Sequence, residues 1–416
     1  MARGEDPFLL AKWNNMKPDI TLVFPSSPFL IDQKVFPPLG IMYLSAYLKQ
    51  NGFSVQCLDM AMHKPEMAES DIIGISFTTP QRGVAYKLAK YYKNQNRFLI
   101  AGGPHATHMH PECLSNGFDI FIGREGEERL LDFLRVSIRK EIKAVNCPEI
   151  DDYPFPDRGA LPIKDYKYEI GGRAATVLMT SRGCPYACSF CAKITKGFRM
   201  QSAERTVNEI LDINEKYGFE AFMIFDDVFI IDKKRLSTMA DLLKDKNFLF
   251  RCFGRANLID DEVCELLKKM GVVEVGLGIE SGSNIILEKN LKGTTRDMNL
   301  KAIQKLHDHG IRAKAFLIIG LPGETISTVA ETSSWINEAQ PDDIDITVFQ
   351  PLPGSAVFAN PEKWGIEFNY DGRPQWYKGR PGRYNCNVRT KELSATQIIT
   401  YRNLMESTYK NKELLR

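Results

Sequence analysis

The sequence predicts an α/β protein with two parallel sheets, one after the other along the chain. Two observations predict this class: strand-like and helix-like segments alternate over residues 19–140, and they alternate again over residues 174–352. A third observation separates the two stretches, because prolines that block helices and strands gather between residues 148 and 162. With 416 residues the chain is also too long for one ordinary domain.

Residues 1–140 are expected to form a doubly wound, Rossmann-like domain. Short apolar runs favour strands at 20–24, 54–58, 72–77, 98–101 and 120–122, and helical patterns lie at 39–51, 84–93 and 127–140. Ligands of such sheets bind beyond the carboxyl ends of the strands. Glycine- and proline-rich loops lie at those ends here, so we expect a ligand site there. Residues 141–173 are expected to be a linker.

Residues 174–352 are expected to form a partial (β/α)6 barrel. Strand patterns occur at 176–180, 221–225, 248–253, 273–279, 313–319 and 344–349, with helical patterns between them. Eight such units close a full barrel, so six predict an open one with its chemistry at the carboxyl ends of the strands. Residues 353–416 are expected to form a small region that covers the substrate, with Trp364, Trp376, Tyr377 and Tyr384 near the cavity.

Composition and charge exclude several classes of protein. The net charge is +2, from 54 basic and 52 acidic residues, which gives no bulk attraction to nucleic acid. No apolar run approaches the roughly 20 residues that span a bilayer. The N-terminus lacks the pattern of a signal peptide, so we expect a cytoplasmic protein. The nine cysteines are an odd number and mostly scattered, which does not indicate a disulfide framework.

Three cysteines stand close together directly after the first strand of the barrel. Cys184, Cys188 and Cys191 have the spacing C-x3-C-x2-C, and thiolates are the usual ligands of iron–sulfur clusters. Three ligands leave one iron of a four-iron cluster open to a substrate. Three buried thiols or a zinc site are the alternatives, but zinc normally takes four protein ligands and no second cysteine pair lies nearby. Phe190 is placed to cover the cluster or an adenine ring.

The segment from Thr180 to Cys191 resembles the cluster motif of the radical S-adenosylmethionine (SAM) superfamily, and residues 174–352 resemble its partial barrel. The resemblance implies a [4Fe–4S] cluster whose open iron binds the amino and carboxylate groups of SAM. Reduction then cleaves SAM to methionine and a 5′-deoxyadenosyl radical. It also implies an external electron donor such as ferredoxin or flavodoxin.

Further residues at strand ends match the positions at which the family binds SAM. The resemblance assigns the amino group to the acidic pair after the second strand, the carboxylate to the arginine after the third, the ribose to the fourth strand end and adenine to the fifth. Helix capping, a solvated arginine and a simple turn are the alternatives. The residues assigned to SAM are Phe190, Asp226, Asp227, Arg255, Glu280, Ser281 and Gly320.

The loops of the first domain resemble the cobalamin-binding domain of the B12-dependent radical SAM class. The resemblance assigns cobalamin contacts to Pro38, Leu39, Gly40, Asp59, Ser76, Thr78, Thr79, Gly102, Gly103, His105, Gly123, Glu125 and Gly126. The motif D-x-H-x-x-G, whose histidine binds cobalt in many such domains, is broken at Asp59 and His63. We therefore predict that no protein nitrogen coordinates cobalt. His105, His108 and His110 are interpreted as hydrogen-bonding or exposed residues rather than as metal ligands.

The resemblance implies a methyltransferase that moves a methyl group from SAM through methylcobalamin to an unactivated carbon. A cobalamin-dependent radical SAM enzyme that rearranges, cyclises or oxidises its substrate is the alternative. A non-catalytic iron–sulfur or B12-sensing protein is a third hypothesis, which Glu280, Asp226 and the complete barrel disfavour. The substrate, whether a small molecule, a peptide or a lipid, stays open.

Overall fold

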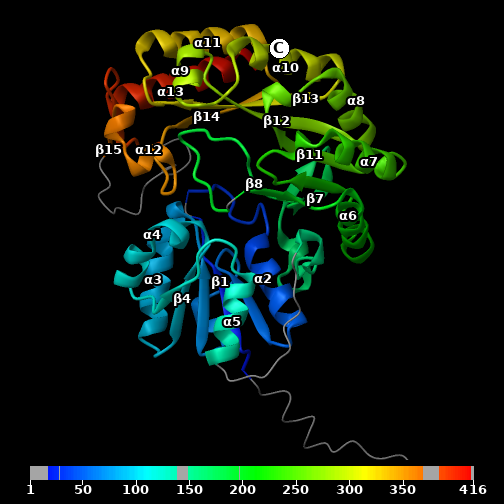
Figure 1. The fold of residues 1–416 in the computed structure, drawn as a ribbon, viewed down its shortest axis with the longest axis vertical. Helices are drawn as coiled ribbons and strands as arrows, with labels where there is room; N and C mark the ends of the chain where they lie inside the picture. The colour runs from blue at the N-terminus through cyan, green and yellow to red at the C-terminus, as the bar shows by residue number, and fades with distance from the viewer. Residues whose placement is uncertain (1–16, 28, 138–148, 196, 369–383, 414–416) are drawn as a thin grey trace, which may run out of the picture. The chain divides into compact units, whose positions relative to one another are not determined.

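The structure, a computed structural model, describes residues 17–27, 29–137, 149–195, 197–368 and 384–413 (Figure 1). Within these residues the chain divides into two compact units. Unit 1 takes residues 17–26, 38–137 and 154–162, and unit 2 takes residues 27–37, 149–153 and 163–413. Segment 27–37 thus belongs to unit 2, although the residues on either side of it belong to unit 1. Segment 154–162 belongs to unit 1, although the residues on either side of it belong to unit 2.

Unit 1 is a doubly wound sheet of five parallel strands in the order β2-β1-β3-β4-β5. From β1 the chain goes to β2 on one side and then to β3 on the other, so the carboxyl ends of β1 and β3 flank a topological switch point. The strands are β1 Ile20–Phe24, β2 Val55–Asp59, β3 Ile72–Ser76, β4 Phe98–Gly102 and β5 Ile120–Phe121; the helices are α2 Leu39–Gln50, α3 Arg82–Lys93, α4 Gly103–Ser115 and α5 Glu127–Ser137.

The strands of unit 1 are apolar on both faces because helices cover both sides of the sheet. Ile73, Ile75 and Leu99 are fully or almost fully buried. Helix α4 is an element that the sequence pattern did not indicate. It begins at Gly103-Pro104, contains Pro111 and is kinked at Met109, and these features hide its helical periodicity.

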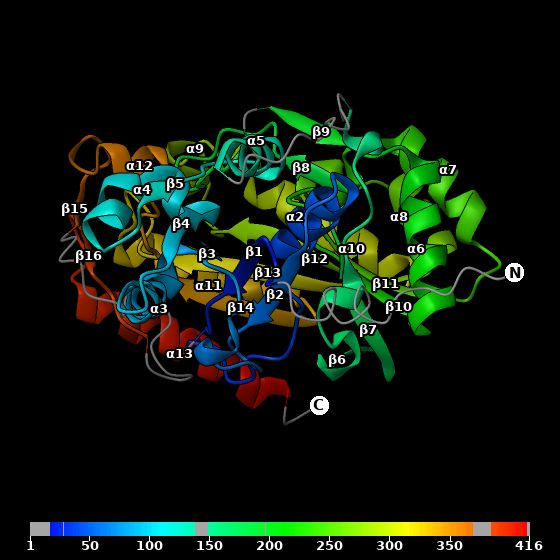
Figure 2. The ribbon, with the colours of Figure 1, turned by 90° about the horizontal axis from the view of Figure 1, so that it is seen from below.

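Unit 2 holds a seven-stranded sheet in the order β14-β13-β12-β11-β10-β7-β6. Six strands are parallel, as predicted for the partial barrel, and β6 is added antiparallel at the edge of β7. Figures 1 and 2 show helices along the outside of this curved sheet. The strands are β6 Tyr168–Ile170, β7 Arg173–Leu178, β10 Ala221–Ile224, β11 Leu249–Gly254, β12 Val272–Glu280, β13 Arg312–Ile319 and β14 Asp343–Val348.

The main helices of unit 2 begin where a polar side chain satisfies the free backbone N–H groups of their first turn. Ser202, Asp232, Asp260, Thr295 and Thr325 each accept a hydrogen bond from the backbone N–H three residues further on. The helices are α6 Ala203–Tyr217, α7 Lys233–Leu243, α8 Asp261–Met270, α10 Arg296–Asp308 and α11 Ile326–Ala339.

Smaller elements complete unit 2. They are the hairpin β8 Ser181–Gly183 with β9 Phe198–Met200, α9 Asn284–Lys289, α12 Ala356–Ala359, the hairpin β15 Ile366–Phe368 with β16 Val388–Thr390, and α13 Ala395–Glu413. Short 3-10 helices occur in both units. Those of unit 1 are Pro65–Met67, Thr79–Gln81 and Arg158–Ala160; those of unit 2 are Ile150–Asp152, Ile163–Asp165, Phe229–Ile231, Ala256–Leu258 and Glu362–Trp364. In the described part of the chain no helix has the length and apolarity that crossing a membrane requires.

The C-terminal elements pack on the barrel around an apolar cluster formed by Ile286, Leu321, Phe349, Val357, Ile366 and Val388. Phe190 and Trp364 pack against it. Tyr384 lies under the Arg402 guanidinium, 3.8 Å from it, and is not part of this cluster. Trp376 and Tyr377 lie outside the described residues, so the predicted covering role of residues 353–416 stays a prediction.

Candidate functional site

The three clustered cysteines lie on the loop between β8 and β9, which follows β7. We call residues Cys184–Cys191 the cluster loop. All three cysteines line one cavity of about 410 Å³ in unit 2. The cavity is bounded by the carboxyl-terminal parts of β10 to β13, where ligands of parallel sheets bind. Its walls also carry the rings of Tyr186, Phe190, Phe225, Phe253 and Phe316.

A buried carboxylate holds the residues from which the cluster loop starts. Asp226, at the end of β10, accepts hydrogen bonds from the N–H of Thr180 at 2.6 Å and of Ser181 at 3.0 Å. Its second oxygen accepts the Thr180 hydroxyl at 2.6 Å. Burial raises the pKa of Asp226, whereas Thr180 and the charge of Arg235 act against that rise. Both carboxylate oxygens are therefore hydrogen-bonded within the protein, and Asp226 fixes the position of β8.

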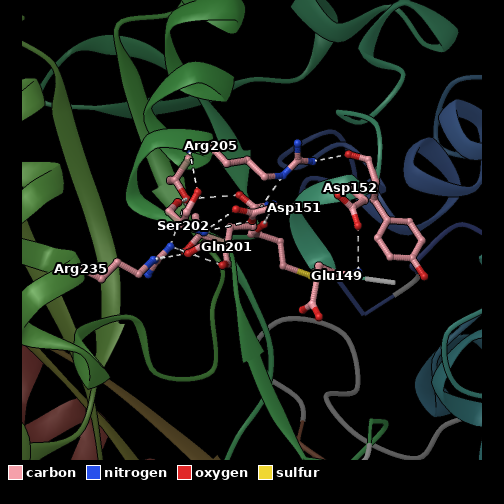
Figure 3. Close-up of polar contacts among 11 residues, drawn as sticks. Glu149, Asp151, Asp152, Gln201, Ser202, Arg205 and Arg235 are labelled. Carbon is pink, nitrogen blue, oxygen red and sulfur yellow. Dashed lines mark hydrogen bonds and ion pairs between the residues drawn. The ribbon is translucent and has the colours of Figure 1, made fainter. Parts of the chain in front are cut away.

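Arg235 fixes the same point from helix α7. Its guanidinium donates to the Thr180 hydroxyl at 2.7 Å and to the backbone oxygen of Gln201, just after β9, at 2.7 Å. Figure 3 shows that this contact continues into a polar network, in which Asp151 accepts the N–H of Ser202. Arg205 completes it by donating to the backbone oxygen of Tyr153 at 2.6 Å. Both strands of the hairpin are thus tied to α6 and α7.

Asp227 has different surroundings from its neighbour Asp226. It lines the cavity and is exposed to it. Partial removal from water raises the pKa of Asp227, the Asp226 carboxylate raises it further, and Lys193 lowers it. Both predicted carboxylates line the cavity: Asp226 is buried with its oxygens hydrogen-bonded to Thr180 and Ser181, whereas Asp227 is exposed.

Glu280 is turned into the cavity by an irregularity in β12. The pairing of β12 with β13 shifts register between Gly278 and Glu280, and Glu280 has a φ of 66°. A bulge of this kind redirects a side chain, and a left-handed backbone is rare outside glycine. The Glu280 carboxylate forms a buried ion pair with Lys292, 2.7 Å from Oε1 to Nζ. Gly278 lies close to this pair: a Cβ there would lie 2.5 Å from Glu280 Oε1, so a larger residue would displace the ends of both side chains.

Lys292 is a site residue that the sequence pattern missed. It lines the same cavity and is 6% exposed. Lys292 follows Glu280 by twelve positions, and helix α9 lies between them in the chain. Neither residue spacing nor helical periodicity therefore predicts that the two side chains form a pair. The ion pair of Glu280 and Lys292 therefore forms part of the wall of the cavity that the three cysteines line.

Arg255 follows β11 and brings a second cation to the cavity. Its guanidinium stacks on the Tyr186 ring at 3.9 Å from the centroid, which is cation–π geometry. It donates to Asn257 Oδ1 at 2.8 Å and lies 3.6 Å from Cys188 Sγ. Arg255 therefore contacts the cluster loop directly, in addition to facing the cavity where the resemblance assigns the SAM carboxylate.

Ser281 and Gly320 do not line the cavity. Ser281 is fully buried, and its hydroxyl lies 3.1 Å from that of Thr332 on α11. Gly320 has a φ of 98°, and its N–H donates to the Glu324 carboxylate. A Cβ at Gly320 would lie 3.0 Å from Ile398 on α13, so the loop after β13 passes close to the C-terminal helix.

Glu324 gives a prediction about stability and pH. Burial raises its pKa from 4.5 to about 8, so the folded protein keeps a proton that the unfolded chain releases above about pH 4.5. The free energy of unfolding should therefore fall as pH rises from about 4.5 to 8 and should level off above 8. Glu324→Gln, a neutral side chain of the same size, should remove this part of the slope. Thermal unfolding midpoints of both proteins between pH 5 and 9 test it; parallel curves would contradict the assignment.

The cysteines suit a cluster better than a single ion. Among the described residues, no group of three or more His, Cys, Asp or Glu side chains has the geometry to hold one metal ion. The three cysteines nevertheless share one cavity wall, as ligands of separate irons in one cluster do. Cys252 and Cys264 are buried in the sheet and helix core and do not line this cavity.

The loops at the carboxyl ends of β3 and β4 in unit 1 are locked together. Gly103 has a φ of 84°, and a Cβ there would lie 2.8 Å from the Phe77 nitrogen and 2.9 Å from Ser76 Oγ. Phe77 N–H donates to Gly102, and His105 N–H donates to Phe77. Only glycine at 103 permits this approach, which brings the predicted residues Ser76, Gly102 and Gly103 together.

His105 is fully buried, and both of its ring nitrogens have partners. Nδ1 lies 3.1 Å from Thr79 Oγ1, and Nε2 lies 3.0 Å from the Tyr86 hydroxyl. Burial lowers the pKa of His105 to about 4, so the ring is neutral at physiological pH. His105 thus connects the loop after β3 with helix α3.

The other predicted residues of unit 1 lie at the same sheet edge or at the start of α2. Asp59 is buried at the end of β2, with Oδ1 accepting the N–H of Ala61. Thr78 donates to the Gln81 side chain. Pro38 precedes α2, where Leu39 is buried and Gly40 is exposed with open space beside it. Gly123, Glu125 and Gly126 lie between β5 and α5.

Comparison with known proteins accounts for both units. Residues 178–336 match the radical SAM superfamily, and residues 33–134 match the B12 binding domain. The chain is also 30% identical over 380 residues to a protein named an uncharacterized methyltransferase from Pyrococcus horikoshii, covering 82% of each chain. The chain belongs to the radical SAM superfamily, as a cobalamin-dependent radical SAM enzyme whose cofactors are a [4Fe–4S] cluster, SAM and cobalamin.

Other relatives have different names. The chain is 27% identical over 365 residues to the anaerobic magnesium-protoporphyrin IX monomethyl ester cyclase of Rubrivivax gelatinosus, covering 78% of this chain and 66% of that one. Among solved structures, the radical SAM enzyme OxsB matches with a TM-score of 0.71 at 18% identity, over 94% of this chain and 66% of that one. The methyltransferase TsrM from Kitasatospora setae matches with a TM-score of 0.66 at 16% identity, over 86% and 79%. At these identities the structures support the fold.

Proposed function

We propose that this enzyme transfers a methyl group, carried from SAM by cobalamin, to an unactivated carbon of its substrate. The observation that carries the proposal is the methyltransferase name of the relative that aligns over 82% of both chains. The cluster supplies the electron that cleaves SAM, and cobalamin supplies the methyl group. A ferredoxin or flavodoxin is the proposed source of the electron.

The chain's own residues hold the reactants. We assign Cys184, Cys188 and Cys191 to three irons of the cluster. In the cavity, Asp227 is the proposed partner of the SAM amino group and Arg255 of its carboxylate, a pairing that the planar guanidinium favours. Glu280, oriented by Lys292, is the proposed partner of the ribose hydroxyls. Phe190, on the cavity wall, excludes water from the adenine side.

The alternative, a reaction without methyl transfer, is favoured by the cyclase name of the relative that is 27% identical. Product analysis separates the two. Methyl transfer consumes two SAM molecules, so reduced enzyme with its substrate should form S-adenosylhomocysteine and 5′-deoxyadenosine in equal amounts. Formation of 5′-deoxyadenosine alone, with a turned-over substrate, would overturn the proposal. No SAM cleavage at all would indicate a non-catalytic protein.

A prediction concerns the lower face of cobalt. The hydrogen bonds of both His105 ring nitrogens support the expectation that this residue does not bind cobalt. In His63, Nδ1 lies 3.0 Å from the backbone oxygen of Asp59. We expect the electron paramagnetic resonance spectrum of the protein with Co(II)-cobalamin to show no splitting by a histidine nitrogen. Nitrogen splitting that disappears in His63→Ala or His105→Ala would contradict this expectation and identify the ligand.

A further inference from the structure

The cluster loop is held at Ser189, between the second and third cysteines, by a residue far away in the sequence. Ser189 is fully buried. Its N–H donates to the backbone oxygen of Asn290 at 3.0 Å, and its hydroxyl bonds to Asn290 Oδ1 at 3.0 Å. Its own backbone oxygen accepts the N–H of Val357 from α12 at 3.2 Å. The loop that carries the cysteines is therefore fixed here by protein contacts as well as at its base.

Asn290 lies at the C-terminal end of α9 and is 1% exposed. Its amide oxygen and its amide nitrogen both have hydrogen-bond partners within the protein. Its amide nitrogen donates to the backbone oxygens of Ile286 at 2.9 Å and Pro322 at 3.0 Å, while Oδ1 accepts the Ser189 hydroxyl. Two carbonyls on one side and a hydroxyl on the other allow only this orientation of the amide. Asn290 thus connects the cluster loop to the loop after β13.

Two of the next three residues, Lys292 and Gly293, lie close to other residues of the cavity wall. Lys292 forms the ion pair with Glu280. Gly293 has a φ of 67°, and a Cβ there would lie 3.1 Å from an Arg255 nitrogen. Residues 290–293 therefore contact the cluster loop, Glu280 and Arg255 within four positions. A shift of Asn290 would move groups on both the cluster side and the SAM side.

We propose that Asn290 is a positioning residue: it fixes the segment between Cys188 and Cys191, through Ser189, relative to the SAM-facing residues. Without the Asn290 side chain, the segment between Cys188 and Cys191 would keep only its backbone hydrogen bonds at Ser189 and would be held less uniformly. The cluster would then sit in a less uniform protein environment and would lose iron more readily. This inference rests on the cluster and SAM sites and is independent of whether the reaction is a methylation.

The test uses full-length, cluster-loaded enzyme, three single variants and the double variant of Asn290 and Ser189. Asn290→Ala removes the side-chain hydrogen bonds to Ser189, Ile286 and Pro322 and keeps the backbone bond to Ser189, and Ser189→Ala removes only the hydroxyl. Asn51→Ala is the matched control, because Asn51 is also a buried residue at a helix end, 2% exposed, whose amide donates to the backbone oxygen four residues earlier. Asn51 ends α2 in unit 1, whereas the cluster loop belongs to unit 2. The melting temperature of each apo-protein measures the structural cost.

The readouts are the electron paramagnetic resonance spectrum of the reduced cluster, with and without SAM, and the rate of iron release to a chelator. We expect Asn290→Ala to broaden or shift the spectrum, to weaken its response to SAM and to release iron at least about fivefold faster. Ser189→Ala should show smaller changes in the same direction, and the double variant should not exceed Asn290→Ala. Asn51→Ala should lower the melting temperature without changing spectrum or release.

Two results would overturn the proposal. The first is that Asn290→Ala has the wild-type spectrum and release rate, or that Asn51→Ala causes the same changes at an equal loss of stability. The second is that Ser189→Ala matches the wild type in both readouts. This second result can be measured even if Asn290→Ala does not fold. Failure of methyl transfer would leave all these measurements interpretable, because none of them depends on the product.

Discussion

Replacing Cys184, Cys188 and Cys191 together by alanine should remove the iron from the protein completely. After anaerobic reconstitution, the wild-type chain should hold about four irons and show the broad thiolate-to-iron absorption of a [4Fe–4S] cluster. The triple variant should fall to background iron and form no 5′-deoxyadenosine. The physical reason is that the three thiolates on this cavity wall are the proposed protein ligands of the cluster.

Cys252→Ala and Cys264→Ala are the matched controls for this prediction. Both cysteines are at most 1% exposed and lie away from the cavity, so each change should cost stability through a small packing defect and leave iron binding intact. Iron retained by the triple variant, or lost in either control that still folds, would show that the cluster ligands lie elsewhere.

Breaking the pair between Glu280 and Lys292 should have the second largest effect. Lys292→Met keeps the length of the side chain but leaves the buried Glu280 carboxylate without its cation. Removing one partner of a buried ion pair costs about 3–5 kcal/mol when the other stays charged. We expect the carboxylate to leave its present position, so that SAM binds at least about tenfold more weakly, equivalent to ~1.4 kcal/mol. Equilibrium dialysis with SAM measures this.

Three comparisons make the result specific. Glu280→Gln should weaken SAM binding to a similar extent, and the double variant should lose less than the sum of the two, because both side chains act as one pair. Lys301→Met, at an exposed lysine on α10, should bind SAM normally. Iron content should stay at the wild-type level throughout. Normal SAM affinity in Lys292→Met and Glu280→Gln would remove both residues from the SAM site.

Local sequence patterns were sufficient to predict the parallel strands of both sheets. The apolar runs of both sheets and the periodic helices between them depend only on neighbouring residues, so the five strands of unit 1 and the six parallel strands of unit 2 could be expected. Helix α4 could not, since Pro111 interrupts its pattern. The β8–β9 hairpin was also missed, because its strands have only three residues each and lie around a loop of cysteines.

The cysteine motif could be identified from local sequence, because Cys184, Cys188 and Cys191 lie within eight residues and cysteine thiolates are the usual ligands of iron–sulfur clusters. The tertiary structure gives the two adjacent residues of the acidic pair different surroundings: both line the cavity, but Asp226 is buried and hydrogen-bonded to Thr180, whereas Asp227 is exposed. It also decided that Glu280 pairs with Lys292 and that Ser189 bonds to Asn290, 101 residues away. Such contacts depend on where separate strands and loops end in space, and no periodicity along the chain records that.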